Sequence, residues 1–247
     1  MKRITMRFLG SGDAFGSGGR FQTCFLLQGE EHALLIDCGA SSLIAMKRAA
    51  VNPSDIGWVA LTHLHGDHFA GLPFLILDGQ FSRRTNPLTI AGPFGVRERL
   101  EAAMEVLFPG SSRVSRRFAT DFIELREGTS SQIGSARVTP FSVPHPSGAA
   151  SYALRIEYGG KLVAYSGDTE WTDALFEAAH GANLFICEAY FFDRKIKHHL
   201  DYATLRAHRE RLECGRLILT HMSCDMLSRE KDSEFECARD GQEVVLE

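Results

Sequence analysis

The feature that most constrains this chain is a short apolar strand that runs directly into a cluster of ionisable side chains. WVAL at 58–61 is followed by THLHGDHFAG at 62–71, so three histidines and one aspartate fall within residues 63–68. So many polar rings at the end of a buried strand are unexpected, because burying each ring costs free energy unless it is hydrogen-bonded or binds a ligand. The stretch therefore predicts buried strands whose ends carry a functional site.

Strand-like and helix-like stretches alternate along the rest of the chain. Strands are predicted at 4–9, 21–28, 32–39, 58–63, 121–127, 136–145, 151–158, 161–168, 183–188 and 216–221. Helices are predicted at 41–50, 69–81, 94–107, 171–181 and 201–215. A turn is expected at Gly29 and Glu30, and Ser41 could cap the first helix. The order favours two similar halves packed sheet against sheet with helices outside, and residues 1–247 are interpreted as one domain.

Composition limits the class of protein. The chain has 247 residues, 44% of them hydrophobic, and a net charge of −4, which argues against a protein that coats nucleic acid or membrane by bulk charge. No apolar run approaches the roughly 20 residues of a membrane span, and the N-terminal residues show no signal-type apolar core. A cytoplasmic protein is expected. The six cysteines form no CxxC pair and are interpreted as reduced core thiols.

The cluster at 63–68 has the spacing of a metal site. His63 and His65 are two residues apart, so at a strand end they point the same way. Gly66 then allows a sharp turn, after which Asp67 and His68 leave the strand direction. The fragment can offer two ligands to one point and two to a neighbouring point. Imidazole with carboxylate suits zinc, iron or manganese rather than calcium.

Three more polar residues stand where a predicted apolar strand becomes a loop. His145 follows ARVTPFSVP, Asp168 follows KLVAY, and His221 follows RLIL. A single histidine after a strand is most often a hydrogen-bonded surface residue. Given the cluster at 63–68, the repetition favours convergence of these three side chains on the same site.

These residues resemble a known pattern. HLHGDH resembles the HxHxDH signature of the metallo-β-lactamase superfamily, and His145, Asp168 in YSGDT and His221 in LTHMS match its remaining ligand positions in order. IDCG at 36–39 resembles the family's second-strand motif. The resemblance implies a four-layer αββα sandwich with two divalent metal ions, Zn²⁺ being favoured and Mn²⁺ or Fe being alternatives. It implies that one metal is held by His63, His65 and His145, the second by Asp67, His68 and His221, and that Asp168 bridges them.

Two further elements indicate a branch of the superfamily. Cys187-Glu188 in NLFICEAYF and HHLDYATL at 198–205 resemble elements of the phosphodiesterase branch that contains tRNase Z. In that branch a histidine paired with a glutamate donates a proton to the leaving oxygen. These roles would fall on His199 and Glu188, with His198 as the alternative to His199. A solvated histidine at a helix start is the competing interpretation.

Departures from the tRNase Z pattern bear on the substrate. The stretch between His145 and Asp168 has room for two strands and a turn, but not for a long tRNA-clamping arm. Basic spots at Arg83-Arg84, 113–117 and 194–197 could meet phosphates, although such clusters are more often only solvated. A tRNA substrate is therefore not expected, and a small cyclic or linear nucleotide-like phosphodiester fits better. A homodimer through a helix face such as 94–107 is allowed by the pattern.

The expected mechanism is hydrolysis by a hydroxide that the two metals share. Asp67 would orient the hydroxide, and His199, held by Glu188, would act as general acid. Other functions on the same site are a thioester or lactone hydrolase, an iron-dependent redox or oxygen-handling protein, and a non-catalytic binding module. The Gly-rich loop at 10–20 is either a phosphate cradle or a flexible connection near the site, and it lacks the Lys-Ser/Thr ending of a P-loop.

Overall fold

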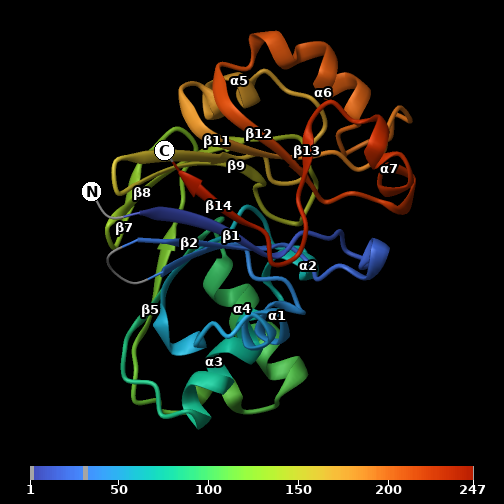
Figure 1. Ribbon diagram of the computed structural model, residues 1–247. Coiled ribbons are helices and arrows are strands. Elements are labelled where there is room, and N and C mark those ends of the chain that lie inside the picture. Colours follow the sequence, from blue (N-terminus) through green and yellow to red (C-terminus); the bar gives the residue numbers. More distant parts are fainter. Residues whose placement is uncertain (1–2, 30–32, 247) are drawn as a thin grey trace.

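Two seven-stranded mixed sheets, stacked face to face, form the centre of the computed structural model, which describes residues 3–29 and 33–246. Helices cover the outer face of each sheet, with α5 and α6 above and α1, α3 and α4 below in Figure 1. The bounds of these helices are Ala174–Ala179 (α5), Tyr202–His208 (α6), Ser42–Arg48 (α1), Leu72–Phe81 (α3) and Val96–Leu107 (α4). The predicted four-layer αββα sandwich is confirmed.

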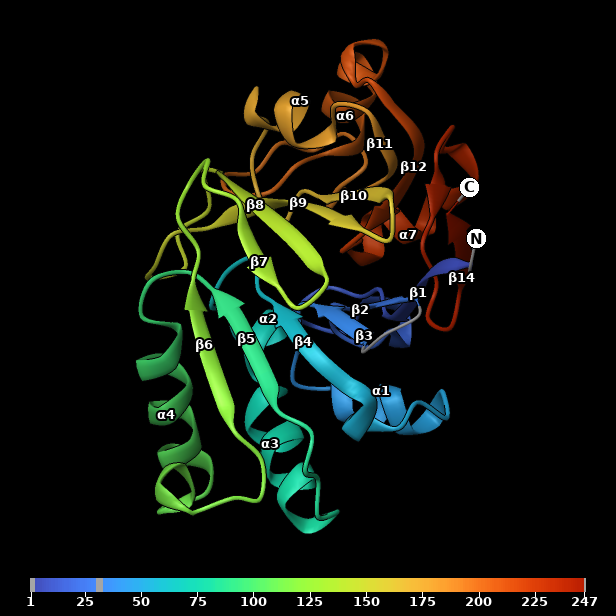
Figure 2. The same cartoon turned by 90° about the vertical axis from the view of Figure 1, so that its left-hand side faces the viewer.

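The first sheet contains the N-terminal half of the chain and one strand from its C-terminal end. Its strand order is β14 (Glu243–Leu246), β1 (Ile4–Gly10), β2 (Cys24–Gln28), β3 (Ala33–Ile36), β4 (Ile56–Ala60), β5 (Leu88–Gly92) and β6 (Thr120–Glu124). Strands β3 to β6 are parallel neighbours, and Figure 2 shows α3 and α4 beside them. The one-turn helix α2 (Gly66–Phe69) and the 3₁₀ turns Ser17–Gly19, Pro53–Asp55 and Ser111–Arg113 complete this half.

The second sheet is built from the C-terminal half. Its order is β13 (Glu236–Cys237), β12 (Cys214–Thr220), β11 (Ala182–Glu188), β10 (Lys161–Tyr165), β9 (Tyr152–Tyr158), β8 (Ala136–Ser142) and β7 (Ser131–Ile133). Strands β10 to β13 are parallel, which brings their carboxyl ends to one edge. The helix α7 (Cys224–Ser228) and the 3₁₀ turns Arg209–Arg211 and Glu230–Asp232 lie in the same half.

Three apolar layers follow from strands that are buried on both faces. Alternate residues of β2 divide between layers: Phe25 and Leu27 pack between the sheets, while Cys24 and Leu26 pack under the helices. Between the sheets the rings of Phe8, Phe25 and Tyr165 meet edge to face, with centroids 5.1 Å apart at each step. The second sheet packs its own layer against α5, α6 and α7. A shared layer between the sheets fixes their relative position.

Several element boundaries differ from the sequence prediction. Helix α6 ends at His208 rather than at residue 215, because the chain from Cys214 pairs with β11 as strand β12. Strands β5, β7, β13 and β14 were not predicted, since each is short and depends on its partner strand. Ser41 precedes α1, but its hydroxyl accepts a hydrogen bond from the Gln22 amide instead of capping the helix. The predicted turn residue Glu30 and the first residue of the strand 32–39 lie outside the described residues.

None of the helices in the described part of the chain is long and apolar enough to cross a membrane. The six cysteines are free thiols, and four of them are buried as expected, whereas Cys214 is half-buried and Cys224 is exposed. The single-domain interpretation stays a prediction, although β14 crosses from the C-terminal half to pair with β1.

Candidate metal centre

The polar residues that follow the strand ends converge at one edge of the sandwich. His63 and His65 come after β4, His145 after β8, Asp168 after β10 and His221 after β12. Carboxyl ends of parallel strands meet at the same sheet edge, and here the edges of both sheets adjoin. The structure therefore brings together all seven residues that the sequence indicated, including Asp67 and His68 on α2. Their role as metal ligands stays a prediction.

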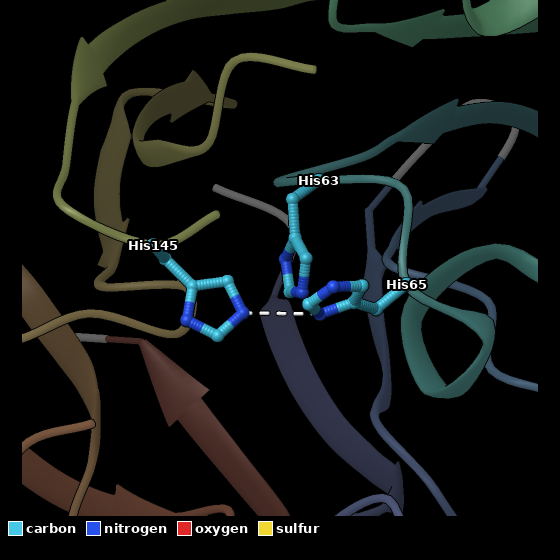
Figure 3. Close-up of side chains that lie close together, drawn as sticks. All are labelled: His63, His65 and His145. Atoms are coloured by element: carbon cyan, nitrogen blue, oxygen red, sulfur yellow. Dashed lines mark hydrogen bonds between the residues drawn. The ribbon is translucent and has the colours of Figure 1, made fainter. Parts of the chain in front are cut away.

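His63, His65 and His145 form the first cluster, called here the three-histidine group. Figure 3 shows the three rings pointing toward one another, with His63 and His65 on the loop after β4 and His145 on a separate segment. Their centroids lie 4.8 to 4.9 Å apart, and His145 Nε2 is 3.0 Å from His65 Nδ1. Burial lowers the pKa of His145 to about 4 and lowers the pKa values of His63 and His65. Neutral imidazoles with lone pairs that converge in this way are suited to a cation.

Asp67, His68, Asp168 and His221 form the second cluster, called here the carboxylate group. His68 Nε2 lies 3.3 Å from Asp67 and 3.4 Å from Asp168, and His221 Nε2 lies 3.2 and 3.4 Å from the same two carboxylates. Burial opposes charge here, but the adjacent carboxylates outweigh it and raise the pKa of His221 to about 9. They also raise the pKa of His68, whereas the histidines hold the pKa values of both aspartates low.

Asp168 links the two groups. Its Oδ2 lies 3.9 Å from the Nε2 atoms of both His63 and His145, and it also faces His221. The carboxylate is almost completely buried, at 2% exposure. A carboxylate with two oxygens can serve two cations at once, so the geometry suits a bridging position.

A shell of hydrogen bonds fixes which imidazole nitrogen faces the centre. Asp37 accepts from His68 Nδ1 at 2.7 Å and from the amide and hydroxyl of Thr62. The Thr62 hydroxyl also lies 3.0 Å from His63 Nδ1. Both rings therefore direct Nε2 inward, as carboxylate-backed ligand histidines do.

Buried polar atoms without a hydrogen-bond partner test whether a metal fits. Among the described residues these atoms include Nε2 of His63, Nε2 of His68 and Oδ1 of Asp168, all facing the centre. A buried polar atom without a partner costs free energy, and such atoms are expected to be explained by a ligand or ion. The donor set of imidazole and carboxylate fits a divalent transition metal.

Glu188 and His199 form a pair beside the carboxylate group. Glu188 ends β11, is completely buried, and accepts hydrogen bonds from the Thr169 amide and from His199 Nδ1, the latter at 3.0 Å. Burial disfavours a charged imidazole, but the hydrogen bond and charge of Glu188 outweigh it and raise the pKa of His199. Burial also raises the pKa of Glu188. Since Nδ1 faces Glu188 and lies 4.0 Å from Asp168, Nε2 points away from both carboxylates.

The structure separates His199 from its neighbour His198, which the sequence could not do. His198 adopts a left-handed backbone with φ of 71° and turns its side chain toward Glu170, 3.3 Å away. Its carbonyl accepts a hydrogen bond from His145 Nδ1 at 2.8 Å, so His198 supports the centre through its backbone. Only His199 of the two pairs with Glu188.

A family model described as "Anti-Pycsar protein Apyc1" matches residues 4–244. The chain belongs to this Apyc1 family. The Apyc1-family chain is also 26% identical to a Ribonuclease Z of Methanosarcina acetivorans over 296 residues, covering 99% of this chain and 93% of that protein. A Ribonuclease Z of Geobacillus kaustophilus is 28% identical over 278 residues, covering 89% of this chain and 88% of that protein.

Solved structures resemble the Apyc1-family chain over nearly its full length. The metallo-β-lactamase fold protein YhfI from Bacillus subtilis has a TM-score of 0.79 at 21% identity, covering 99% of this chain and 100% of that chain. The human short-form tRNase Z has a TM-score of 0.79 at 24% identity, covering 98% and 99%. These likenesses confirm the metallo-β-lactamase fold. The Ribonuclease Z relatives and the clustered His and Asp side chains support a metal-dependent hydrolase of the nuclease or phosphodiesterase type.

Sequence reasoning missed the residues that support the site. Asp37 lies in the IDCG motif, yet no role was assigned to it before the structure placed it against His68 and Thr62. The glycine of this motif has a steric reason, because a Cβ on Gly39 would lie 2.2 Å from the carbonyl oxygen of Asp67. The IDCG motif was the sequence signal that could have identified Asp37 and Gly39 as residues that support the site.

The Gly-rich loop differs from both expectations. Asp13 is buried and accepts hydrogen bonds from the amides of Phe15 and Ser17, while Asp240 accepts from the amides of Ser11 and Phe21. The carboxylates of Asp13 and Asp240 thus already accept hydrogen bonds from amides that a phosphate cradle would need. The same hydrogen bonds hold the loop in place. The Ser11 carbonyl accepts from the His221 amide at 3.3 Å, which anchors the loop beside the carboxylate group.

Two of the basic spots contain an arginine with a structural role. Arg84 is buried and donates to the carbonyls of Pro53, Ile56, Asn86 and Pro87, so it is not available to a phosphate. Arg116 likewise donates to the carbonyls of Ser111 and Val114. In the segment 194–197, Arg194 lies over the Phe191 ring at 3.6 Å, and both lysines are exposed.

Proposed function

We propose that this protein is a two-metal phosphodiesterase that hydrolyses a small, nucleotide-like phosphodiester, either cyclic or linear. The observation that carries the proposal is the convergence of two ligand groups on Asp168, with the buried Glu188 and the half-buried His199 paired beside them. The Ribonuclease Z and diphosphatase names among similar proteins support a phosphorus–oxygen bond as the target.

The proposed ligands divide between the two groups. His63, His65 and His145 would hold one ion, and Asp67, His68 and His221 would hold the other. Asp168 would be shared, and Zn²⁺ is favoured by the imidazole-rich set. When bound, the two ions lower the pKa of a water and offset the negative charge of the phosphate.

The remaining chemistry belongs to side chains of this chain. Asp67 is held as a carboxylate because His68 and His221 keep its pKa low, so it can accept a hydrogen bond from the attacking water and orient it. His199 keeps a proton because Glu188 raises its pKa, and its Nε2 can donate to the departing oxygen. Glu188 holds the ring from Nδ1. The reaction adds water across the P–O bond and leaves an alcohol and a phosphomonoester.

A small substrate is supported by what this chain lacks relative to Ribonuclease Z. The alignment with the Methanosarcina acetivorans protein spans 296 positions against the 247 residues of this chain, so that protein carries insertions absent here. Strands β9 and β10 with their connections occupy the stretch between His145 and Asp168. The exclusion of tRNA, the homodimer and the cytoplasmic location stay predictions.

The first experiment measures hydrolysis of bis(p-nitrophenyl) phosphate by protein loaded separately with zinc, manganese or iron. Turnover that is lost in Asp67→Ala, with metal content measured in both proteins, supports phosphodiester chemistry at this centre. Cyclic mononucleotides, linear dinucleotides and a precursor tRNA then rank the natural substrates. A protein that carries two metals and hydrolyses none of these contradicts the proposal, and thioesters and lactones become the next substrates to test.

The acid role of His199 has its own test. An alkoxide leaves poorly without a proton, whereas a nitrophenolate leaves without help, so His199→Ala should lower turnover of alkyl diesters by about 10²- to 10⁴-fold. Turnover of nitrophenyl diesters should change little. His198→Ala is the matched control and should show no such dependence on the leaving group. Equal losses on both substrate types would contradict the acid role.

A further inference from the structure

Tyr190 is held rigidly between the two segments that carry His199 and His221. It follows Glu188 by two residues, just beyond the end of β11. Its amide donates to the carbonyl of Leu200 at 2.8 Å, and its carbonyl accepts from the amide and hydroxyl of Ser223 at 3.0 and 2.5 Å. The backbone of Tyr190 therefore ties the end of β11 to the chain on either side of the centre.

The Tyr190 ring lies against the face of the His199 imidazole. The two centroids are 4.8 Å apart with an interplanar angle of 29°, which is a stacked arrangement. The rings of Phe191 and Tyr190 meet edge to face with centroids 4.8 Å apart, and the His221 ring centroid lies 6.0 Å from that of Tyr190. The tyrosine hydroxyl has no hydrogen-bond partner among the described residues, so the ring and not the hydroxyl makes the contact.

One hydrogen bond does not fix an imidazole. The Glu188 contact holds His199 at Nδ1 only, and the ring can still tilt about that point and carry Nε2 away from its target. A face contact removes that freedom. Tyr190 supplies the stacked face, and the edge of the His145 ring, with centroids 5.1 Å apart at 71°, limits movement from another side.

We propose that Tyr190 is a positioning residue that holds the plane of His199, so that Nε2 stays aimed at the leaving oxygen of the phosphodiester. The inference rests on the proposed function, because it assigns Tyr190 to the proton-donating half of that reaction. It concerns ring geometry alone. Errors of about 1 Å in the placement of a catalytic group can cost 10²-fold in rate, so a loosened ring should be visible in turnover.

The experiment compares Tyr190→Leu and Tyr190→Phe on an alkyl diester and on bis(p-nitrophenyl) phosphate. Leucine removes the stacking face, and kcat for the alkyl diester should fall about 10- to 100-fold while KM changes little. The nitrophenyl substrate needs no proton donor, so its turnover should stay near that of the unaltered protein. Phenylalanine keeps the face and should restore alkyl diester turnover. Metal content and Tm are measured for each variant.

Phe191→Leu is the matched control, because Phe191 contacts Tyr190 at 4.8 Å and forms no stack on His199 in the described structure. It should not discriminate between leaving groups. Equal losses on both substrates in Tyr190→Leu, or no loss on the alkyl diester, would overturn the positioning role. If His199→Ala discriminates and Tyr190→Leu does not, only this inference fails. If the unaltered protein hydrolyses neither diester, the proposed function fails and the inference falls with it.

Discussion

The three-histidine group and the carboxylate group lie side by side and share Asp168, yet their histidines favour opposite charge states. Burial lowers the pKa of His145 to about 4. The Asp168 carboxylate acts in the opposite direction, but at 3.9 Å it does not offset the effect of burial. In the carboxylate group, Asp67 and Asp168 lie 3.2 and 3.4 Å from His221 and raise its pKa to about 9. When a metal binds, the three-histidine group therefore has no proton to release, whereas the carboxylate group must release protons.

The difference originates in a few residues of local structure. His63 and His65 continue the extended direction of β4, and Gly66 starts the one-turn helix α2, which carries Asp67 and His68. The turn sends the next two side chains to a neighbouring point, where Asp168 and His221 arrive from the other sheet. The two half-sites therefore differ in charge because one stretch of chain changes direction at Gly66.

The largest effect is expected from Asp168→Asn, which removes the charge that the two groups share. Loss of a bridging carboxylate should weaken both metals and remove several kcal/mol of transition-state stabilisation, about 10³-fold in turnover. The measurement is turnover of bis(p-nitrophenyl) phosphate together with metal content after dialysis. A variant that retains two ions and normal turnover would contradict the shared position of Asp168.

Lower pH should weaken metal binding at the carboxylate group but not at the three-histidine group. In the metal-free protein, His221 with a pKa of about 9 is protonated at neutral pH, and a metal must displace that proton, whereas His145 with a pKa of about 4 carries none. Metal affinity of the carboxylate group should fall about tenfold per pH unit for each displaced proton, thus about 100-fold between pH 8 and pH 6 for the His221 proton alone and more when His68 also releases one. Affinity of the three-histidine group should change little. At a fixed free zinc concentration that just fills both groups at pH 8, we expect two ions per chain at pH 8 and one at pH 6, and loss of both ions together would contradict the asymmetry.

Removal of a supporting carboxylate should affect one group only. Asp37→Asn weakens the hydrogen bond to His68 Nδ1, and such substitutions typically cost 10- to 100-fold in metal affinity. The carboxylate group should lose affinity by this amount and the three-histidine group should not. Titration with zinc under calorimetry resolves the two binding steps. Asp121→Asn, an exposed carboxylate on β6, is the control and should leave both steps unchanged.

The smallest effect is expected from Thr62→Val, which touches both groups at once. The Thr62 hydroxyl donates to Asp37 and lies 3.0 Å from His63 Nδ1, so valine leaves His63 Nδ1 without this partner and leaves Asp37 Oδ2 with His68 alone. Such losses cost about 1–3 kcal/mol. Chemical denaturation of the metal-free protein should show a lower free energy of unfolding. A change confined to one zinc-binding step, with no loss of stability, would show that Thr62 supports one group alone.

Much of the fold and of the candidate site could be predicted, because local patterns carried the information. Apolar strands that end in His or Asp must bring those residues to sheet edges, so His63, Asp168 and His221 could be grouped before any coordinates. The sequence favoured His199 over His198 only moderately, because the distinction depends on the left-handed backbone at His198 and on Glu170 beside it. The roles of Asp37 and Arg84 depend on contacts with segments distant in sequence, and hydrophobic periodicity does not report such contacts.

The pairing of β14 with β1 affects the order in which the parts of the protein fold. Ile4 pairs with Leu246, and Asp240 supplies the carboxylate that receives Ser11 and Phe21 at the base of the Gly-rich loop. Contacts between such distant residues form slowly, because a long loop must close before they stabilise anything. During synthesis all seven proposed ligands leave the ribosome before Asp240 does. The Gly-rich loop anchored beside His221 can therefore take its final position only after all seven proposed ligands have been synthesised.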